Sequence, residues 1–151
     1  MNPGSVCILL VAATLLGCNE TQIIHVADYE EWKRLSDADK AWFPDNMPVR
    51  AYGIYAMYEL DTSATNIAFQ LSADGIANLE QSLMRLPPED VNWPPMKLNL
   101  PWWPSVLNNR SLEDAQRLGL IFSTYEQKWH KSKINWGVAI DPKMQKVYFW
   151  H

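Results

Sequence analysis

The chain has 151 residues, of which 48% are hydrophobic and 20% charged, with a formal net charge of −4 at pH 7. This composition excludes an intrinsically disordered chain, and the acidic balance argues against a nucleic-acid-binding surface. The two cysteines of the sequence, Cys7 and Cys18, both lie in the first eighteen residues. The rest of the chain therefore offers no disulfide, thiolate nucleophile or cysteine-ligated metal.

The first eighteen residues combine a short apolar segment with a cysteine. Residues 6–17 carry no charge and number roughly a dozen, whereas a helix that spans a membrane needs about 20 residues. The segment ends in Leu15-Leu16-Gly17-Cys18 and is followed directly by polar residues. This tetrapeptide resembles the lipobox of bacterial lipoproteins.

The resemblance implies that residues 1–17 are a signal peptide removed by signal peptidase II, and that Cys18 receives the acyl chains. We then expect a lipidated tether over residues 18–26 and a single domain over residues 27–151. The sequence departs from the usual signal peptide in having no Lys or Arg before the apolar segment. Asn19 is not the aspartate that tends to retain such lipoproteins in the inner membrane. Lipid attachment at the periplasmic face, with the outer membrane favoured over the inner, is therefore expected.

The first half of the domain alternates helical and extended patterns. Residues 21–26 fit either a short tether or a first edge strand. Asp28 and Ser36 are suited to cap two short helical segments, over residues 28–35 and from residue 36. Residues 51–60 and 66–71 have the composition of strands. The clearest helix follows Ser72, because its apolar residues recur at helical spacing as far as the prolines that stop it. That stripe consists of Ile76, Leu79, Leu83 and Leu86.

The second half predicts a short helix over residues 111–119 and strands over residues 120–129, 134–140 and 146–150. Together, these elements indicate a small single α+β domain. We expect a mainly antiparallel sheet of about five strands, with one main helix packed on it and a short N-terminal helical segment.

A segment rich in proline and tryptophan separates the two halves. Residues 87–104 contain six prolines together with Trp93, Trp102 and Trp103. A rigid backbone could display these rings to a partner, and exposed tryptophans suit protein hot spots and sugar stacking. The three tryptophans are therefore a candidate binding loop. In the alternative interpretation, which we favour, the rings lie inward and cover an open sheet face.

Charge is divided along the chain. Residues 19–90 carry thirteen acidic and five basic side chains, a net of −8, and residues 91–151 carry four and eight, a net of +4. The two parts either form opposite faces suited to a charged partner or interleave as an ordinary solvated surface, which is the interpretation we favour.

Catalytic patterns are absent from the sequence. The three histidines, His25, His130 and His151, form no metal-binding or nucleophile motif, and the paired carboxylates are explained by helix caps and solvation. We therefore predict no catalytic residue, no metal and no cofactor.

The leading hypothesis is a non-enzymatic cell-envelope lipoprotein that binds a protein partner, by analogy an inhibitor- or immunity-like module. The alternative is a lipoprotein that binds glycan or peptidoglycan through the proline- and tryptophan-rich loop. A third hypothesis is an envelope hydrolase that uses His130 with a carboxylate such as Glu126. A nucleic-acid partner is not expected.

Overall fold

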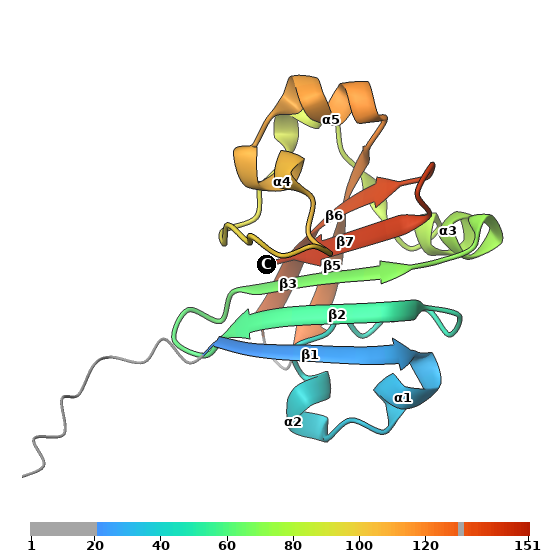
Figure 1. Cartoon of the computed structure of the whole chain (residues 1–151), viewed down its shortest axis with the longest axis vertical. Helices are drawn as coiled ribbons and strands as arrows, with labels where there is room; N and C mark the ends of the chain where they lie inside the picture. The colour runs from blue at the N-terminus through green and yellow to red at the C-terminus, as the bar shows by residue number, and fades with distance from the viewer. Residues whose placement is uncertain (1–20, 130–131) are drawn as a thin grey trace, which may run out of the picture.

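The computed structural model describes residues 21–129 and 132–151, which form one α+β domain (Figure 1). The proposed lipobox, Cys18 and His130 lie outside the described residues. A seven-stranded antiparallel sheet has the order β1-β2-β3-β7-β6-β5-β4. Its strands are β1 (Thr21–Asp28), β2 (Tyr52–Glu59), β3 (Thr65–Gln70), β4 (Met84–Arg85), β5 (Ile121–Trp129), β6 (Ser132–Asp141) and β7 (Lys146–Trp150). The helices are α1 (Tyr29–Lys33), α2 (Asp37–Lys40), α3 (Ala73–Glu80), the 3-10 turn η1 (Pro88–Asp90), α4 (Ser105–Asn109) and α5 (Leu112–Leu118).

The central strand is β7, which pairs with β3 on one side and β6 on the other. Successive side chains of a strand point to opposite faces of the sheet. Val147 and Phe149 therefore point to one face, called the first face, and Tyr148 and Trp150 point to the second face. All four side chains are buried. Both faces of the sheet must consequently be covered.

The first face is covered by α1, α2, the segment of residues 41–51 and α3. Ile76 and Leu79 of α3 are buried in this core, and Leu83 packs against it, as the apolar stripe predicts. The Ser72 side chain caps α3 by accepting a hydrogen bond from the Gly75 backbone N–H at 3.2 Å. The buried sheet residues of this face include Ile54, Ile67, Phe69, Val138, Ile140, Val147 and Phe149.

Helix α3 is shorter than its apolar stripe predicts. The helix ends at Glu80, and the Ser82 hydroxyl donates to the Leu79 carbonyl at 2.8 Å, which occupies one of the last helical acceptors. The chain then turns into the sheet as β4, and the Leu86 N–H donates to the Phe122 carbonyl at 2.9 Å. Pairing with β5 therefore replaces the last helical turn that the spacing predicts.

The second face is covered by residues 91–104, α4 and α5 (Figure 1). Its core combines side chains from the sheet with side chains from the covering segment and the two helices. They include Ala68, Met96, Leu98, Trp103, Leu107, Ala115, Phe122, Tyr148 and Trp150. The prediction of one main helix on a sheet of about five strands is thus wrong in detail, because seven strands and several short helices share the two faces.

Residues 21–26 form an edge strand and not a tether. In β1 the register runs from Thr21 opposite Glu59 to Asp28 opposite Tyr52, and Val26 is buried against the first face. The folded unit therefore includes residues that the sequence assigned to the tether. The predicted caps of the following helices are confirmed, since Asp28 accepts from the Glu31 N–H and Ser36 accepts from the Asp39 N–H.

The sheet order also separates the two charged parts of the chain. Strands β1, β2 and β3 come from the acidic part and lie together at one end, whereas β5, β6 and β7 come from the basic part and lie toward the other. Other elements cross between the two parts, because β4 of the acidic part pairs with β5 and Trp102 of the basic part stacks on Tyr55 of β2. The strands are thus grouped by charge, whereas the covering elements are not, and the interleaved surface stays a prediction.

Candidate functional site

Two of the three candidate tryptophans pack in the hydrophobic core on the second face of the sheet, called the second core. Trp103 is 4% exposed and meets the rings of Tyr148 and Trp150 edge-on, with centroid distances of 5.6 and 6.5 Å. Trp93 is half-buried and packs edge-on against Phe122 at 5.6 Å. The favoured interpretation of inward-lying rings therefore holds for Trp103 and in part for Trp93.

The segment that carries these tryptophans is fixed by hydrogen bonds to its backbone. The Trp150 indole N–H donates to the Asn92 carbonyl at 2.6 Å, and Arg110 donates to the Pro94 carbonyl at 3.3 Å. The Asn108 amide bonds both backbone groups of Leu98, accepting from its N–H at 2.9 Å and donating to its carbonyl. These contacts position the next residues of the segment, including Trp102, over β2.

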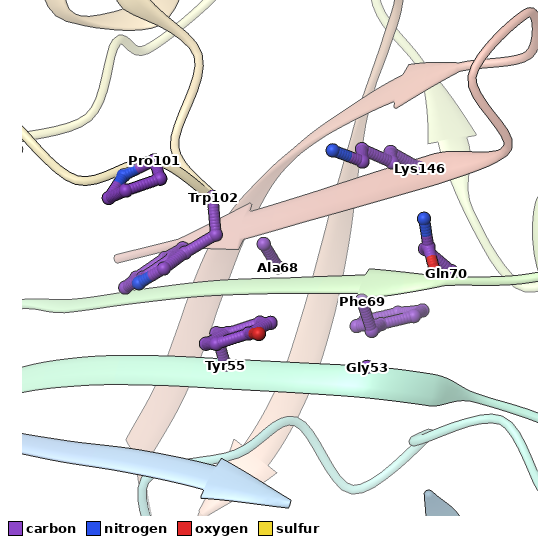
Figure 2. A pocket seen from close by; sticks show the side chains of 8 residues that line it. All are labelled: Gly53, Tyr55, Ala68, Phe69, Gln70, Pro101, Trp102 and Lys146. Atoms are coloured by element: carbon purple, nitrogen blue, oxygen red, sulfur yellow. The ribbon is translucent and has the colours of Figure 1, made fainter. Parts of the chain in front are cut away.

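Trp102 borders a hollow on the second face. Its ring lies nearly parallel to that of Tyr55, with a centroid distance of 5.6 Å and an interplanar angle of 15°. The hollow beside this pair has a volume of about 420 Å³, which lies within the usual range of small-molecule sites. We call it the Trp102 hollow (Figure 2). Its lining residues are Gly53, Tyr55, Ala68, Phe69, Gln70, Pro101, Trp102 and Lys146.

Small residues leave the Trp102 hollow open. Ala68 lies between the aromatic pair and the polar side chains of Gln70 and Lys146 (Figure 2). Gly53 has a φ of 54°, a conformation that side chains with a Cβ rarely adopt, at an irregularity in the β2–β3 register. A Cβ at Gly53 would lie 3.5 Å from the Gln70 Oε1. The bulge therefore brings a bare backbone under the Gln70 amide.

Two polar side chains line the Trp102 hollow without protein partners. Neither the Gln70 amide nor the Lys146 ammonium makes a side-chain hydrogen bond or ion pair with any other described residue. Asp141 lies opposite Lys146 in the register, but its carboxylate accepts from the Lys143 and Met144 backbone N–H groups, at 3.1 and 3.0 Å. The polar groups of the hollow are thus available to a ligand.

An aromatic row links the hollow to the edge of the sheet. The His25 ring of β1 stacks on Tyr55 of β2, with a centroid distance of 4.1 Å and an interplanar angle of 10°. Tyr55 in turn stacks on Trp102 of the covering segment. Beside this row, Ile23 is 59% exposed and lies opposite Met57. The second face of β1 and β2 is therefore open and partly apolar.

Most of the edge strand β1 lacks the usual protection of sheet edges, although the strand ends in Asp28 and its Ala27 N–H donates to the Glu31 carboxylate at 2.7 Å. It pairs with β2 on one side and has no strand on its other side among the described residues. Residues 21–27 contain no Lys, Arg, Asp, Glu or Pro, the residues that commonly discourage pairing at an edge. The opposite edge, β4, has two residues and includes Arg85. The two edges of the sheet thus differ in length and in protection.

Two of the residues weighed for catalysis make contacts with other side chains of the fold. Glu126, considered with His130, pairs with Lys133 at 2.9 Å. His151 lies half-buried with its ring edge-on to Trp136 at 4.3 Å, and burial lowers the pKa of this imidazole. Residues 21–129 and 132–151 contain no group of three His, Cys, Asp or Glu side chains that could hold a metal ion.

Two tyrosines, the partly buried Tyr125 and the buried Tyr148, have pKa values raised well above the ordinary value of 10. Burial raises the pKa of Tyr125 to about 12, with further contributions from its hydrogen bond to Asp45 and from the charge of that carboxylate. Burial also raises the pKa of Tyr148 to about 12, assisted by the charge of Asp141. Both phenols therefore stay neutral at physiological pH and act as hydrogen-bonding or packing groups.

The sequence patterns did not single out most of the hollow. Tyr55, Gln70 and Lys146 stand in ordinary alternating strands, and their convergence depends on β3 pairing with β7, which is distant in the chain. Gly53 offers one local signal, because an isolated glycine within a strand pattern indicates a bulge.

Residues 20–70 are similar to the YbbD head domain. This match covers about a third of the chain and runs from β1 to the end of β3, so it includes the open edge and Tyr55 but neither Trp102 nor Lys146. No curated protein and no solved structure matches the chain. Among the helices of the described residues, none has the length and apolarity needed to cross a membrane.

Proposed function

We propose that this chain is a non-enzymatic lipoprotein of the bacterial cell envelope that binds a protein partner by strand addition at β1. In this mode an extended segment of the partner pairs with the free edge of a sheet. Main-chain hydrogen bonds then supply affinity, and alternate side chains supply specificity. The observation that carries the proposal is the free edge of β1 over residues 21–27, which contains no charged residue or proline, beside the exposed Ile23.

The net negative charge around β1 indicates the charge of the proposed partner. Residues 21–70 carry eight acidic and four basic side chains, a net of −4, and include helices α1 and α2 beside β1 (Figure 1). An acidic surface favours encounter with a basic segment. The proposed partner is therefore an envelope protein with an exposed, basic, extended segment. Neutralisation of such a protein by capping its segment would correspond to an inhibitor- or immunity-like role.

The proposed attachment to the membrane rests on Leu15-Leu16-Gly17-Cys18. Each buried methylene of an acyl chain contributes about 0.8 kcal/mol, so two or three chains on Cys18 give stable anchoring. Strand β1 begins at Thr21, three residues after that cysteine. The binding edge would thus be held close to the lipid headgroups, at the periplasmic face and by preference on the outer membrane.

A lysine on the edge strand tests the proposal. Ile23→Lys places a charge on β1 at an exposed position, so the fold is retained while edge pairing is opposed. Met144→Lys is the matched control, because Met144 is 60% exposed in the β6–β7 turn, away from β1. Crosslinked pull-downs from envelope extract are expected to recover a partner with the unaltered chain and Met144→Lys, and to lose it with Ile23→Lys. Equal recovery with all three chains would contradict the proposal.

A second candidate function is glycan binding at the Trp102 hollow. The specific observation in its favour is the parallel Tyr55–Trp102 pair beside two polar side chains that have no protein partner. Trp93 and Trp103 do not line the hollow, since Trp93 packs against Phe122 and Trp103 packs between Tyr148 and Trp150. The sugar-binding surface of this candidate is therefore smaller than the three-tryptophan loop predicted from the sequence. Titration with chitin oligosaccharides, followed by calorimetry, tests it.

A further inference from the structure

We propose that the Trp102 hollow is a binding site for a saccharide unit that bears a carboxylate. The inference rests on the second candidate function, glycan binding, and names the chemical class of the sugar. It is carried by three groups that surround one cavity: an aromatic pair, an amide and an ammonium. Each matches a different part of an acidic sugar.

The aromatic pair suits the apolar face of a sugar ring. Tyr55 and Trp102 come from β2 and from the covering segment, and their rings form one side of the hollow (Figure 2). Tyrosine and tryptophan provide large apolar surfaces together with a polar tip. The C–H groups on one side of a pyranose ring pack against such surfaces. The Tyr55 hydroxyl points toward the side of the hollow on which Gln70 and Lys146 lie (Figure 2).

The opposite side of the hollow is polar. Gln70 of β3 and Lys146 of β7 are directly opposite in the register, so their side chains share the second face. The Gln70 amide can both donate to and accept from sugar hydroxyls, and the Lys146 ammonium supplies three donors and a positive charge. A neutral sugar would leave that charge unused. A carboxylate would instead form a charge-assisted hydrogen bond, which is stronger than a neutral one.

The cavity has room for such a unit. The volume is about 420 Å³; Ala68 lies between the aromatic and polar sides (Figure 2), and Gly53 lies beside the Gln70 amide, so larger side chains at these two positions would reduce it. The covering segment that carries Trp102 is anchored to Trp150 and Asn108. The site is thus held open by the fold, which limits the ordering that binding requires.

N-acetylmuramic acid and N-acetylglucosamine form a matched pair of probes, because they differ by a lactyl ether that bears a carboxylate. Calorimetric titration of the full chain in detergent is expected to show about tenfold tighter binding of N-acetylmuramic acid, as one charge-assisted hydrogen bond at a partly exposed site supplies. The Lys146→Gln variant is expected to bind both sugars equally. The Lys143→Gln variant, altered in the neighbouring turn, is expected to keep the preference. Thermal unfolding of each variant checks that the fold is retained.

The outcomes separate the inference from the function on which it rests. Equal binding of the two sugars by the unaltered chain, or a preference that persists in Lys146→Gln, would overturn the acidic-sugar inference and leave glycan binding intact. A lack of binding by both monosaccharides and by chitin oligosaccharides at millimolar concentration would overturn the inference together with the second candidate function. A preference lost in Lys146→Gln and kept in Lys143→Gln supports the inference.

Discussion

Gly137 of β6 lies directly against the indole of Trp150 on the second face of the sheet. A Cβ at Gly137 would be 2.3 Å from both Cε2 and Nε1 of Trp150, far inside contact distance. The indole that occupies this space also donates to the Asn92 carbonyl and meets Trp103 edge-on. The missing side chain at Gly137 therefore permits the contacts that fix the covering segment and, through it, Trp102.

Gly137→Ala is expected to destabilise the domain by roughly 1–3 kcal/mol, because the added methyl group must displace the Trp150 ring or the β6 backbone. Gly75→Ala is the matched control. There a Cβ would lie 3.2 Å from a methyl group of Leu71, and alanine favours the helix by up to about 1 kcal/mol. Urea unfolding of the two variants measures the difference, and equal stability would show that Trp150 does not fill the space beside Gly137.

Trp102→Ala and Trp103→Ala are expected to have different effects. Trp103 is almost fully buried among Tyr148 and Trp150, so its truncation should cost roughly 3–5 kcal/mol. Trp102 is only partly buried and borders the hollow, so its truncation should cost clearly less stability while removing sugar binding. Chemical denaturation and calorimetry of both variants provide the comparison. A greater loss of stability for Trp102→Ala would contradict the assignment of the two rings.

The pH dependence of stability is expected to include a contribution from His151. Burial lowers the pKa of the folded imidazole below the unfolded value of 6.5, so the unfolded chain binds more protons between these two values. The stability of the domain should therefore fall as the pH drops through 6.5 toward the folded pKa. His151→Gln should remove this part of the pH dependence. Unfolding curves between pH 7.5 and 5 test the prediction, and identical profiles for the two chains would refute it.

Cys18→Ala is expected to release the protein from the membrane fraction of the producing bacterium, because the acyl chains supply the attachment. Cys7→Ala should leave the protein membrane-bound, since Cys7 lies in the segment assigned to the signal peptide. Labelling with radioactive palmitate, followed by fractionation, measures both variants. Equal palmitate incorporation in Cys18→Ala would contradict the proposed lipobox.

Local patterns predicted much of the secondary structure. The caps at Asp28, Ser36 and Ser72 depend on residues three positions away, and each accepts the expected backbone hydrogen bond. The strand patterns of the second half likewise correspond to β5, β6 and β7. Pairing between distant segments was not encoded locally. The truncation of α3 depends on Phe122, and the β3–β7 pair that brings Gln70 beside Lys146 joins segments separated by most of the domain.

The candidate site was predicted only in part for the same reason. The proline- and tryptophan-rich composition indicated a special segment, and both an inward and an outward orientation were compatible with it. The orientation of each ring depends on the side chains of the sheet that lie beneath it. Trp103 packs between Tyr148 and Trp150, whereas Trp102 stacks on Tyr55 of β2, beside Ala68 of β3, which is too small to fill the second face. These neighbours are visible only once the sheet order is known.

Salt is expected to weaken the proposed complex with a protein partner. The acidic surface around β1, α1 and α2 favours a basic segment, and exposed charges are screened over about 10 Å at 0.1 M salt. Association rates measured by surface plasmon resonance should fall as sodium chloride is raised from about 0.05 to about 0.5 M, because the screening length shortens over this range. A rate that is independent of salt would contradict the charge-based part of the proposal.

Site-specific photo-crosslinking in intact cells tests the central claim, binding at the edge of β1, most directly. A photoreactive phenylalanine analogue replaces Ile23 of β1 in one chain and Met144 of the β6–β7 turn in another, and both residues are exposed. The account predicts a discrete crosslinked protein from position 23, lost when edge pairing is blocked by Thr21→Lys, and none from position 144. The absence of a crosslink at position 23, or the same crosslinked protein from both positions, would contradict it.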